Sequence, residues 1–313
     1  MNAVILGYGV VGKGIEILAK SLDDINIKYV YVRKEKENLP YFSNNEDIVV
    51  QDDIDIVFEC LNGLEPANTL IQKALKKGKH VISSNKAVVA TYLDTYLELE
   101  KEYGGSIQVE ACVAGGIPFI DALLKLKRLE PLQGYEGIFN GTSNYILDSM
   151  QKNNLDFEDV LKQAQDKGYA EKDPSNDIDG VDVYYKTKIS NSLAFNTPIV
   201  DIPYYAGIRT IKMLDIKFIK MNNKVLRHLS ISRQIGDKII SIIAPCCMDE
   251  SDFLANVPNN YNAQKILSHS FDTLGYYGQG AGQLPTAQAM VQNALDTLEN
   301  KERKIVYSTP KEF

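Results

Sequence analysis

Short apolar runs alternate with amphipathic segments over roughly the first 127 residues of the chain. Four runs rich in β-branched or aliphatic residues predict strands: residues 4–6, 27–32, 56–58 and 80–83. Between the first two runs, Ile15, Leu18 and Leu22 recur at helical spacing, and residues 70–75 form a second amphipathic segment. This alternation predicts an α/β domain with helices on both faces of a parallel sheet and ligands outside the carboxyl ends of its strands.

The pattern changes near Arg128. A helix is expected to begin near Gly180, and strand-like runs cover residues 218–221 and 239–243. A last helical pattern over residues 286–301 is expected to pack back on the first domain. We therefore expect two domains: a nucleotide-binding domain of residues 1–127 with 283–313, and an α+β domain of residues 128–282 for substrate binding and dimerisation.

Composition and charge exclude several classes of protein. The chain has 34 Lys and Arg against 41 Asp and Glu, a net charge of −7, and the charges are mixed, which excludes the basic surface of a nucleic-acid-binding protein. It has neither a basic, apolar leader nor an apolar stretch of the ~20 residues needed to span a bilayer. We expect a cytoplasmic protein that binds no nucleic acid and no membrane.

Cysteines and histidines offer little chemistry. The four cysteines, Cys60, Cys112, Cys246 and Cys247, form no zinc or redox spacing and are expected to be small apolar residues. The three histidines are isolated from one another, which argues against a histidine metal site or a catalytic triad. Proton transfer is therefore assigned to lysines, carboxylates or tyrosines.

A glycine motif follows the first predicted strand. Gly7, Gly9 and Gly12, with Val10 and Val11 between them, form a G-x-G-x-x-G between a strand and a helix. The first glycine permits the tight turn, the second admits a pyrophosphate, and the third lets helix and strand pack closely. The context predicts a Rossmann-type domain that binds a dinucleotide.

The end of the second predicted strand bears on which dinucleotide binds. Arg33 and Lys34 stand where an NAD site would carry a carboxylate for the ribose hydroxyl. A guanidinium suits a 2′-phosphate, so the pattern favours NADP, with NAD as the alternative if these are solvated surface charges.

Two further segments carry candidate chemistry. Lys86 follows a buried strand and is expected at the carboxyl edge of the sheet, as a functional group or as a surface charge. Asp182 and Lys186 lie four residues apart on a predicted helix and share a face. The acidic stretch before them lacks the spacing of a calcium-binding loop, so a solvated loop is the other reading.

Long motifs resemble homoserine dehydrogenase. The resemblance is carried by FNGTSNYIL, by the segment from GYAEKDPSNDIDG to Lys186, by SNKA and EACVAGGIP, and by GQGAG with the following PTA. It implies an oxidoreductase that interconverts L-aspartate 4-semialdehyde and L-homoserine with NADP(H) or NAD(H), in threonine, methionine and isoleucine biosynthesis, as a homodimer. The sequence leaves one alternative class: a catalytically silent NADP-binding redox sensor or regulatory subunit.

The resemblance also implies roles for individual residues. Lys186 and Lys86 would handle the proton, and Asp182 would orient Lys186. The amino-acid substrate would be contacted by Glu171, Asp177, Thr142, Tyr169 and Gly141. Cofactor contacts would extend beyond the glycine motif and Arg33–Lys34 to Ser83, Lys86 and Gly280. A monovalent cation such as Na⁺ would be held by Glu110, Val113, Gly115 and Ile117, although this segment also fits a glycine turn before a helix that starts at a proline.

Several positions depart from the family pattern. Leu61-Asn62-Gly63 replaces a threonine-rich turn, Ser83-Ser84 replaces Thr-Ala, and Gln279 replaces a proline. The few residues after Gly282 leave no room for the family's common ACT regulatory domain, so we expect no threonine inhibition through such a domain.

A cysteine-thioester dehydrogenase using Cys112 or Cys60 is the enzyme alternative that needs a different mechanism.

Overall fold

The chain folds into two compact units. The computed structural model describes residues 1–33, 40–301 and 305. The first unit comprises Met1–Asp121 with the segment that starts at Ala281, and the second comprises Ala122–Gly280. The sequence placed these boundaries at 127/128 and 282/283. The helix α4 (Phe119–Leu126) crosses the first boundary, which explains why no loop marks it in the sequence.

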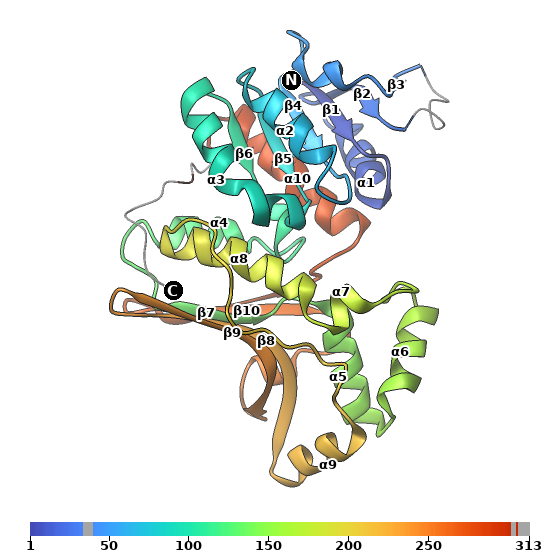
Figure 1. Cartoon of the computed structure of the whole chain (residues 1–313), viewed down its shortest axis with the longest axis vertical. Coiled ribbons are helices and arrows are strands. Elements are labelled where there is room, and N and C mark those ends of the chain that lie inside the picture. Colours follow the sequence, from blue (N-terminus) through green and yellow to red (C-terminus); the bar gives the residue numbers. More distant parts are fainter. Residues whose placement is uncertain (34–39, 302–304, 306–313) are drawn as a thin grey trace. The chain divides into compact units, whose positions relative to one another are not determined.

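The first unit is built on a six-stranded parallel sheet in the order β3-β2-β1-β4-β5-β6 (Figure 1). Its strands are β1 (Asn2–Leu6), β2 (Asn26–Tyr31), β3 (Phe42–Ser43), β4 (Ile56–Glu59), β5 (His80–Ser83) and β6 (Ser106–Gln108). The strand order reverses on the two sides of β1. In sheets of this type, ligands bind at such a reversal, outside the carboxyl ends of the strands.

Helices cover both faces of this sheet (Figure 1). On one face α1 (Val10–Ala19) packs with α10 (Gln283–Leu298), over a core that includes Ile5, Phe58 and Met290. On the other face α2 (Ala67–Leu75) packs with α3 (Lys86–Tyr103). Short 3₁₀ turns occur at η2 (Glu46–Val50) and η3 (Glu110–Cys112). Burial on both faces explains why the inner strands read as continuous apolar runs rather than alternating ones.

The second unit contains a five-stranded antiparallel sheet in the order β11-β10-β7-β8-β9 (Figure 1). Its strands are β7 (Gly134–Ile138), β8 (Lys224–Ile235), β9 (Lys238–Asp249), β10 (Asn262–Ser268) and β11 (Asp272–Gly278). Its helical elements after α4 are α5 (Gly141–Asn153), α6 (Phe157–Asp166), α7 (Ser175–Ile178), α8 (Val181–Phe195), α9 (Met213–Met221) and η4 (Leu254–Asn256). The prediction of an α/β fold with a second α+β domain is confirmed.

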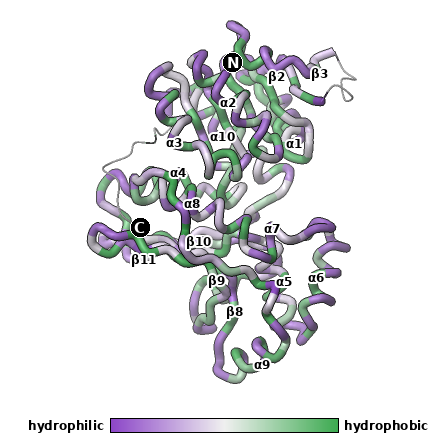
Figure 2. The backbone as a smooth tube through the Cα atoms, viewed as in Figure 1, coloured by the Kyte–Doolittle hydropathy of each residue, from purple (hydrophilic) through white to green (hydrophobic). Residues whose placement is uncertain are grey.

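The surface helix α6 shows how patterning sets these elements. Each of its turns contains both hydrophobic and hydrophilic residues, which Figure 2 colours green and purple. Phe157, Val160 and Ala164 recur at helical spacing and are buried, while Glu158 and Asp159 lie in the first turn. Carboxylates in the first turn also favour the helix because they face its positive end.

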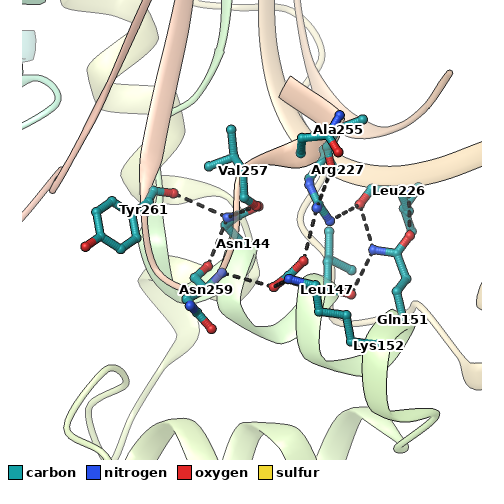
Figure 3. Close-up of polar contacts among 12 residues, drawn as sticks. Asn144, Leu147, Gln151, Lys152, Leu226, Arg227, Ala255, Val257, Asn259 and Tyr261 are labelled. Carbon is teal, nitrogen blue, oxygen red and sulfur yellow. Dashed lines mark hydrogen bonds and ion pairs between the residues drawn. The ribbon is translucent and has the colours of Figure 1, made fainter. Parts of the chain in front are cut away.

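Buried polar side chains attach α5 to β8 and to the loop before β10 (Figure 3). Arg227 Nη2 lies 3.1 Å from Asp148 Oδ1 and donates to the carbonyl of Ala255 at 2.6 Å. Asn144 Nδ2 donates to the carbonyl of Asn259 at 2.9 Å, and Gln151 Oε1 accepts from the backbone N–H of Leu226 at 2.7 Å. These contacts fix α5, whose first turn contributes to the candidate site.

The prediction of a strand over residues 218–221 is wrong, because these residues end the helix α9. The helix buries Met213 and Ile216 and packs Ile219 against the same core, which is a helical spacing. Asp215 accepts a hydrogen bond from the backbone N–H of Lys212 at 2.8 Å and thereby fixes the start of the helix. Among the described residues, no helix is long and apolar enough to span a membrane.

Candidate active site

The glycine turn between β1 and α1 has the shape of a phosphate-binding loop. Gly7 has φ +95°, and a Cβ on Gly12 would lie 2.1 Å from the carbonyl oxygen of Gly7, so both positions require glycine. A Cβ on Gly9 would meet nothing within 4 Å, which leaves open space above the first turn of α1. Val10 at the start of that helix is 64% exposed, and Val11 follows it. The turn therefore fits a pyrophosphate at a helix N-terminus.

Arg33 follows the strand that contacts this turn. The backbone N–H of Gly7 donates to the carbonyl of Tyr31, the last residue of β2, at 3.1 Å. Arg33 follows two residues later and is exposed at the carboxyl edge of the sheet. Lys34, the other predicted cation, lies outside the described residues.

Lys86 begins α3 directly after β5. The side chain of Asn85 caps this helix by accepting from the backbone N–H of Val88 at 3.3 Å. Ser83 is buried, and its hydroxyl donates to the carboxylate of Glu59 at 2.5 Å. The structure thus places Lys86 at the carboxyl edge of the sheet, as predicted, and adds Glu59, which the sequence did not single out.

A buried chain of polar groups surrounds Lys186 in the second unit. Lys186 Nζ lies 2.8 Å from Asp182 Oδ2 and donates to the carbonyl of Phe139 at 2.7 Å, and only 8% of the residue is exposed. Asn140 Nδ2 donates to Asp182 Oδ2 at 2.9 Å and to Asp177 Oδ1 at 2.7 Å. The predicted Asp182–Lys186 contact is therefore present, and Asn140 joins it to Asp177.

Asn140 is the residue that the sequence reasoning missed here. Its side-chain oxygen accepts from the backbone N–H of Ser143 at 2.7 Å and caps α5. An asparagine directly before a helical pattern is a common capping signal and could have marked this position. Its amide nitrogen then remains to bind the two carboxylates.

The other predicted substrate residues lie on the loops around these carboxylates. Thr142 Oγ1 donates to the carbonyl of Tyr169 at 2.5 Å, which joins the start of α5 to the acidic loop. Tyr169 and Glu171 are exposed on that loop. A Cβ on Gly141 would lie 2.5 Å from the carbonyl oxygen of Asn260, so a larger residue would displace the first turn of α5.

His228 lies close to this cluster but is not a proton donor for it. It is 1% exposed, and its Nε2 lies 2.8 Å from the carbonyl oxygen of Ala206. Burial lowers the pKa of His228 to about 4. The imidazole is therefore neutral at physiological pH, in agreement with the assignment of proton transfer to lysines and carboxylates.

Gly280 has a packing role within the second unit. A Cβ there would lie 1.9 Å from the amide nitrogen of Asn262, so a larger residue would displace the Asn262 side chain. Gly280 was predicted as a cofactor contact, and its close approach to Asn262 is a sufficient reason for glycine at this position.

The predicted cation segment forms a turn with one buried carboxylate. Glu110 accepts backbone N–H groups from Ile120 at 3.0 Å and from Asp121 at 2.6 Å. Ala114 and Gly115 have φ +60° and +55°, and α4 begins at Phe119 directly after Pro118. Burial raises the pKa of Glu110 to about 8. A cation beside this carboxylate would offset the cost of burying its charge, so the residues fit one.

The cysteines are unsuited to a thioester mechanism. All four are free, and burial raises the pKa of the Cys112 thiol above its usual range. Burial also raises the pKa of Cys60. A buried thiol that resists ionisation is a poor nucleophile. Among the described residues there is also no group of three or more His, Cys, Asp and Glu side chains that could hold a metal ion.

Comparisons with known proteins cover both units. The family profile "Homoserine dehydrogenase" matches residues 118–295, and the profile "Homoserine dehydrogenase, NAD binding domain" matches residues 7–110. The chain is 37% identical over 265 residues, 84% of its length, to a homoserine dehydrogenase of Neisseria gonorrhoeae. It is 32% identical over 96% of its length to a homoserine dehydrogenase of Lactococcus lactis. The chain spans 61% of the length of the Neisseria protein and 75% of the Lactococcus protein.

A solved structure agrees in fold. The crystal structure of a homoserine dehydrogenase from Thiobacillus denitrificans superposes with a TM-score of 0.93 at 32% identity, covering 100% of this chain and 79% of that one. These matches confirm the predicted resemblance, the oxidoreductase class and the binding of a nicotinamide dinucleotide, and they give no support to a purely regulatory protein. The chain belongs to the homoserine dehydrogenase family.

Proposed function

We propose that the chain interconverts L-aspartate 4-semialdehyde and L-homoserine, with NADP(H) preferred over NAD(H), in the biosynthesis of threonine, methionine and isoleucine. The observation that carries this proposal is the hydrogen-bonded group of buried Lys186, Asp182 and Asn140 with the half-buried Asp177, in a chain of this family. A bound nicotinamide supplies or accepts the hydride, and the protein must handle the proton and hold the amino acid.

Lys186 is the proposed acid and base. Its ammonium has three N–H donors, and among the described residues two of them have partners, Asp182 and the carbonyl of Phe139. The third is left for the substrate oxygen, which becomes an alkoxide when the aldehyde is reduced. Asp182 holds the lysine in one rotamer, and Asn140 fixes Asp182 in turn. Lys86 is proposed as the second proton-handling lysine.

The carboxylates and the loop around them are proposed to bind the amino-acid end of the substrate. Asp177 and Glu171 carry negative charges that suit the substrate ammonium. Thr142, Tyr169 and Gly141 shape the same end of the second unit, where the hydroxyl of Thr142 already fixes the acidic loop. We propose that this group selects the L-amino acid.

Arg33 is the proposed reason for an NADP preference. It is exposed at the carboxyl edge of the sheet, past the strand that contacts the glycine turn, where a 2′-phosphate is expected. A guanidinium binds such a phosphate with two charge-assisted hydrogen bonds. Lys34 is proposed to assist, and Ser83, Lys86 and Gly280 are the further proposed cofactor contacts.

Two finer features are also proposals. Glu110, with the backbone of Val113, Gly115 and Ile117, is proposed to hold a monovalent cation such as Na⁺, supported by the burial of a carboxylate beside a left-handed turn. A homodimer is proposed because Ile240 and Ile242 of the edge strand β9 are exposed, and the protein is proposed to act in the cytoplasm. An apolar edge strand needs cover, which a two-fold copy supplies. A sedimentation experiment that gives only a species of 35.0 kDa, the mass of one chain, would contradict the dimer.

The function is tested with the purified full chain. We expect oxidation of L-homoserine with NADP⁺, followed by the absorbance of the reduced nicotinamide, and a lower kcat/KM with NAD⁺. D-homoserine is the matched control, because the same hydroxyl is present while the amino-acid end is inverted. If L-homoserine were oxidised neither with NADP⁺ nor with NAD⁺, the proposal would be contradicted.

A further inference from the structure

Glu59 is a buried carboxylate at the carboxyl end of β4. It is 0% exposed, and each of its oxygens accepts a hydrogen bond. Oε1 accepts from the backbone N–H of Leu61 at 2.8 Å, and Oε2 accepts from the hydroxyl of Ser83 at 2.5 Å. Burial raises the pKa of Glu59 to about 7, although these hydrogen bonds oppose the shift. A carboxylate in such a place is costly to bury, and packing alone would favour an apolar residue.

The contacts of Glu59 continue to the start of α3. The Ser83 oxygen, which donates to Glu59, accepts from the backbone N–H of Asn85 at 3.1 Å. Asn85 in turn caps α3 and donates from Nδ2 to the carbonyl of Gly63 at 2.8 Å. Glu59 and Asn85 therefore hold both ends of the turn 61–63 and fix the backbone from which Lys86 extends.

When Glu59 is ionised, both of its oxygens act as acceptors. A backbone N–H can only donate, so Leu61 and Asn85 are fixed as donors. The Ser83 oxygen receives the Asn85 N–H and directs its own hydrogen to Glu59. An ionised carboxylate supplies two acceptors, whereas a glutamine of the same size supplies one acceptor and one NH₂ donor.

We propose that Glu59 is a positioning residue for Lys86, acting through Ser83 and Asn85 to hold the first turn of α3 in the orientation that catalysis needs. This inference rests on the proposed function, in which Lys86 is the second proton-handling lysine. Glu59 itself touches neither substrate nor cofactor in this account. Because Ser83 and Lys86 are also proposed cofactor contacts, its removal should lower kcat and raise KM for NADP⁺ by a smaller factor.

Glu59→Gln is the first test. Glutamine keeps the size of the side chain but offers one acceptor and one NH₂ donor. Its oxygen faces the Leu61 N–H, so the NH₂ group faces Ser83. The Ser83 oxygen then accepts two N–H groups, and its own hydrogen loses the acceptor that Glu59 provided. We expect kcat for homoserine oxidation to fall by about 10- to 100-fold, the scale of a small misplacement of a catalytic group, and KM for NADP⁺ to rise by a smaller factor.

The controls separate this effect from general damage to the fold. Glu98→Gln changes an exposed carboxylate on α3, the helix that begins with Lys86, and should leave kcat unchanged. Ser83→Ala removes the linking hydroxyl and should resemble Glu59→Gln, whereas Ser83→Thr keeps a hydroxyl and should retain more of kcat. The two Ser83 variants keep the test available if Glu59→Gln does not fold.

The decisive measurement repeats Glu59→Gln in a Lys86→Met background. If Glu59 acts through Lys86, the double variant should have a kcat within about twofold of Lys86→Met alone. A further loss as large as that in the wild-type background would overturn the proposal, as would an unchanged kcat in Glu59→Gln or in Lys86→Met. Failure of the proposed function is a separate result, since the wild-type protein would then not oxidise homoserine.

Discussion

Arg33 is the residue on which cofactor choice depends in this account. We expect Arg33→Ala to raise KM for NADP(H) by roughly 10- to 150-fold, the effect of losing a charge-assisted hydrogen bond of about 1.5 to 3 kcal/mol, and to change KM for NAD(H) little. Lys77→Ala is the matched control, because Lys77 is an exposed cation between α2 and the amino end of β5. Equal effects on both cofactors, or a wild-type preference for NAD(H), would exclude this role.

Individual site residues were predictable where spacing alone defines a contact. Asp182 and Lys186 follow the four-residue spacing of a helix face, and their side chains meet at 2.8 Å. Asn140 carried a capping signal but lies 42 residues from Asp182, and no local pattern predicts their contact. Glu59 looks like the last residue of a strand, so its partners Ser83 and Leu61 become visible only when β4 and β5 pair.

At the scale of elements, the buried ion pair between α5 and β8 makes a specific prediction. Asp148 and Arg227 have side chains only 3% and 4% exposed. Removing the charge of one therefore leaves the charge of the other buried and unpaired. We expect Asp148→Asn to lower the free energy of unfolding by about 3 to 5 kcal/mol in urea denaturation. Asp148→Asn with Arg227→Met should recover part of this loss, because no unpaired charge remains.

Lys152→Ala is the control for that pair. Lys152 also contacts Asp148, at 2.9 Å, but its side chain is 59% exposed, and surface pairs contribute about 1 kcal/mol or less. If Lys152→Ala were as destabilising as Asp148→Asn, burial of the Arg227 charge would not be the cause.

Elements of the first unit were predicted well because a buried parallel sheet leaves continuous apolar runs. The residues of β5 match the predicted run 80–83, and α10 begins three residues before the predicted helix 286–301. The elements of the second unit were harder to predict from the sequence. Residues 218–221 read as a strand because Phe218, Ile219 and Met221 lie close together, yet the buried positions of α9 are Met213 and Ile216. Phe218 and Met221 are exposed there, so hydrophobicity alone was misleading.

For the whole molecule, His228 predicts a loss of stability in acid. The folded-state pKa of about 4 lies below the ordinary value of 6.5, so the unfolded chain binds the proton more tightly. Stability is therefore retained above pH 6.5 and lost as the pH falls toward 4, by up to about 3 kcal/mol. We expect His228→Gln to weaken the fall of Tm between these pH values, with the exposed His269→Gln as control. An unchanged pH dependence in His228→Gln would contradict this origin.

The two-part organisation was visible in the sequence as a change from alternating strands and helices to a less regular pattern. The position of the change was less clear, because α4 continues across the boundary between Asp121 and Ala122. The proposed groups are divided between the two units: the glycine turn and Lys86 belong to one, and Lys186 with its carboxylates belongs to the other. Neither unit carries the complete set of proposed groups.

The kcat of Lys186→Met for homoserine oxidation is therefore the most direct test of the central claim. Lys188→Met is the matched control, because Lys188 lies on the same helix and pairs with the exposed Asp201 at 2.8 Å. We predict that Lys186→Met lowers kcat by about 10²- to 10⁴-fold while the Kd for NADP⁺ stays within about twofold, since a proton-transfer group acts on the chemical step. Retention of more than about a tenth of the wild-type kcat in Lys186→Met would contradict the assignment.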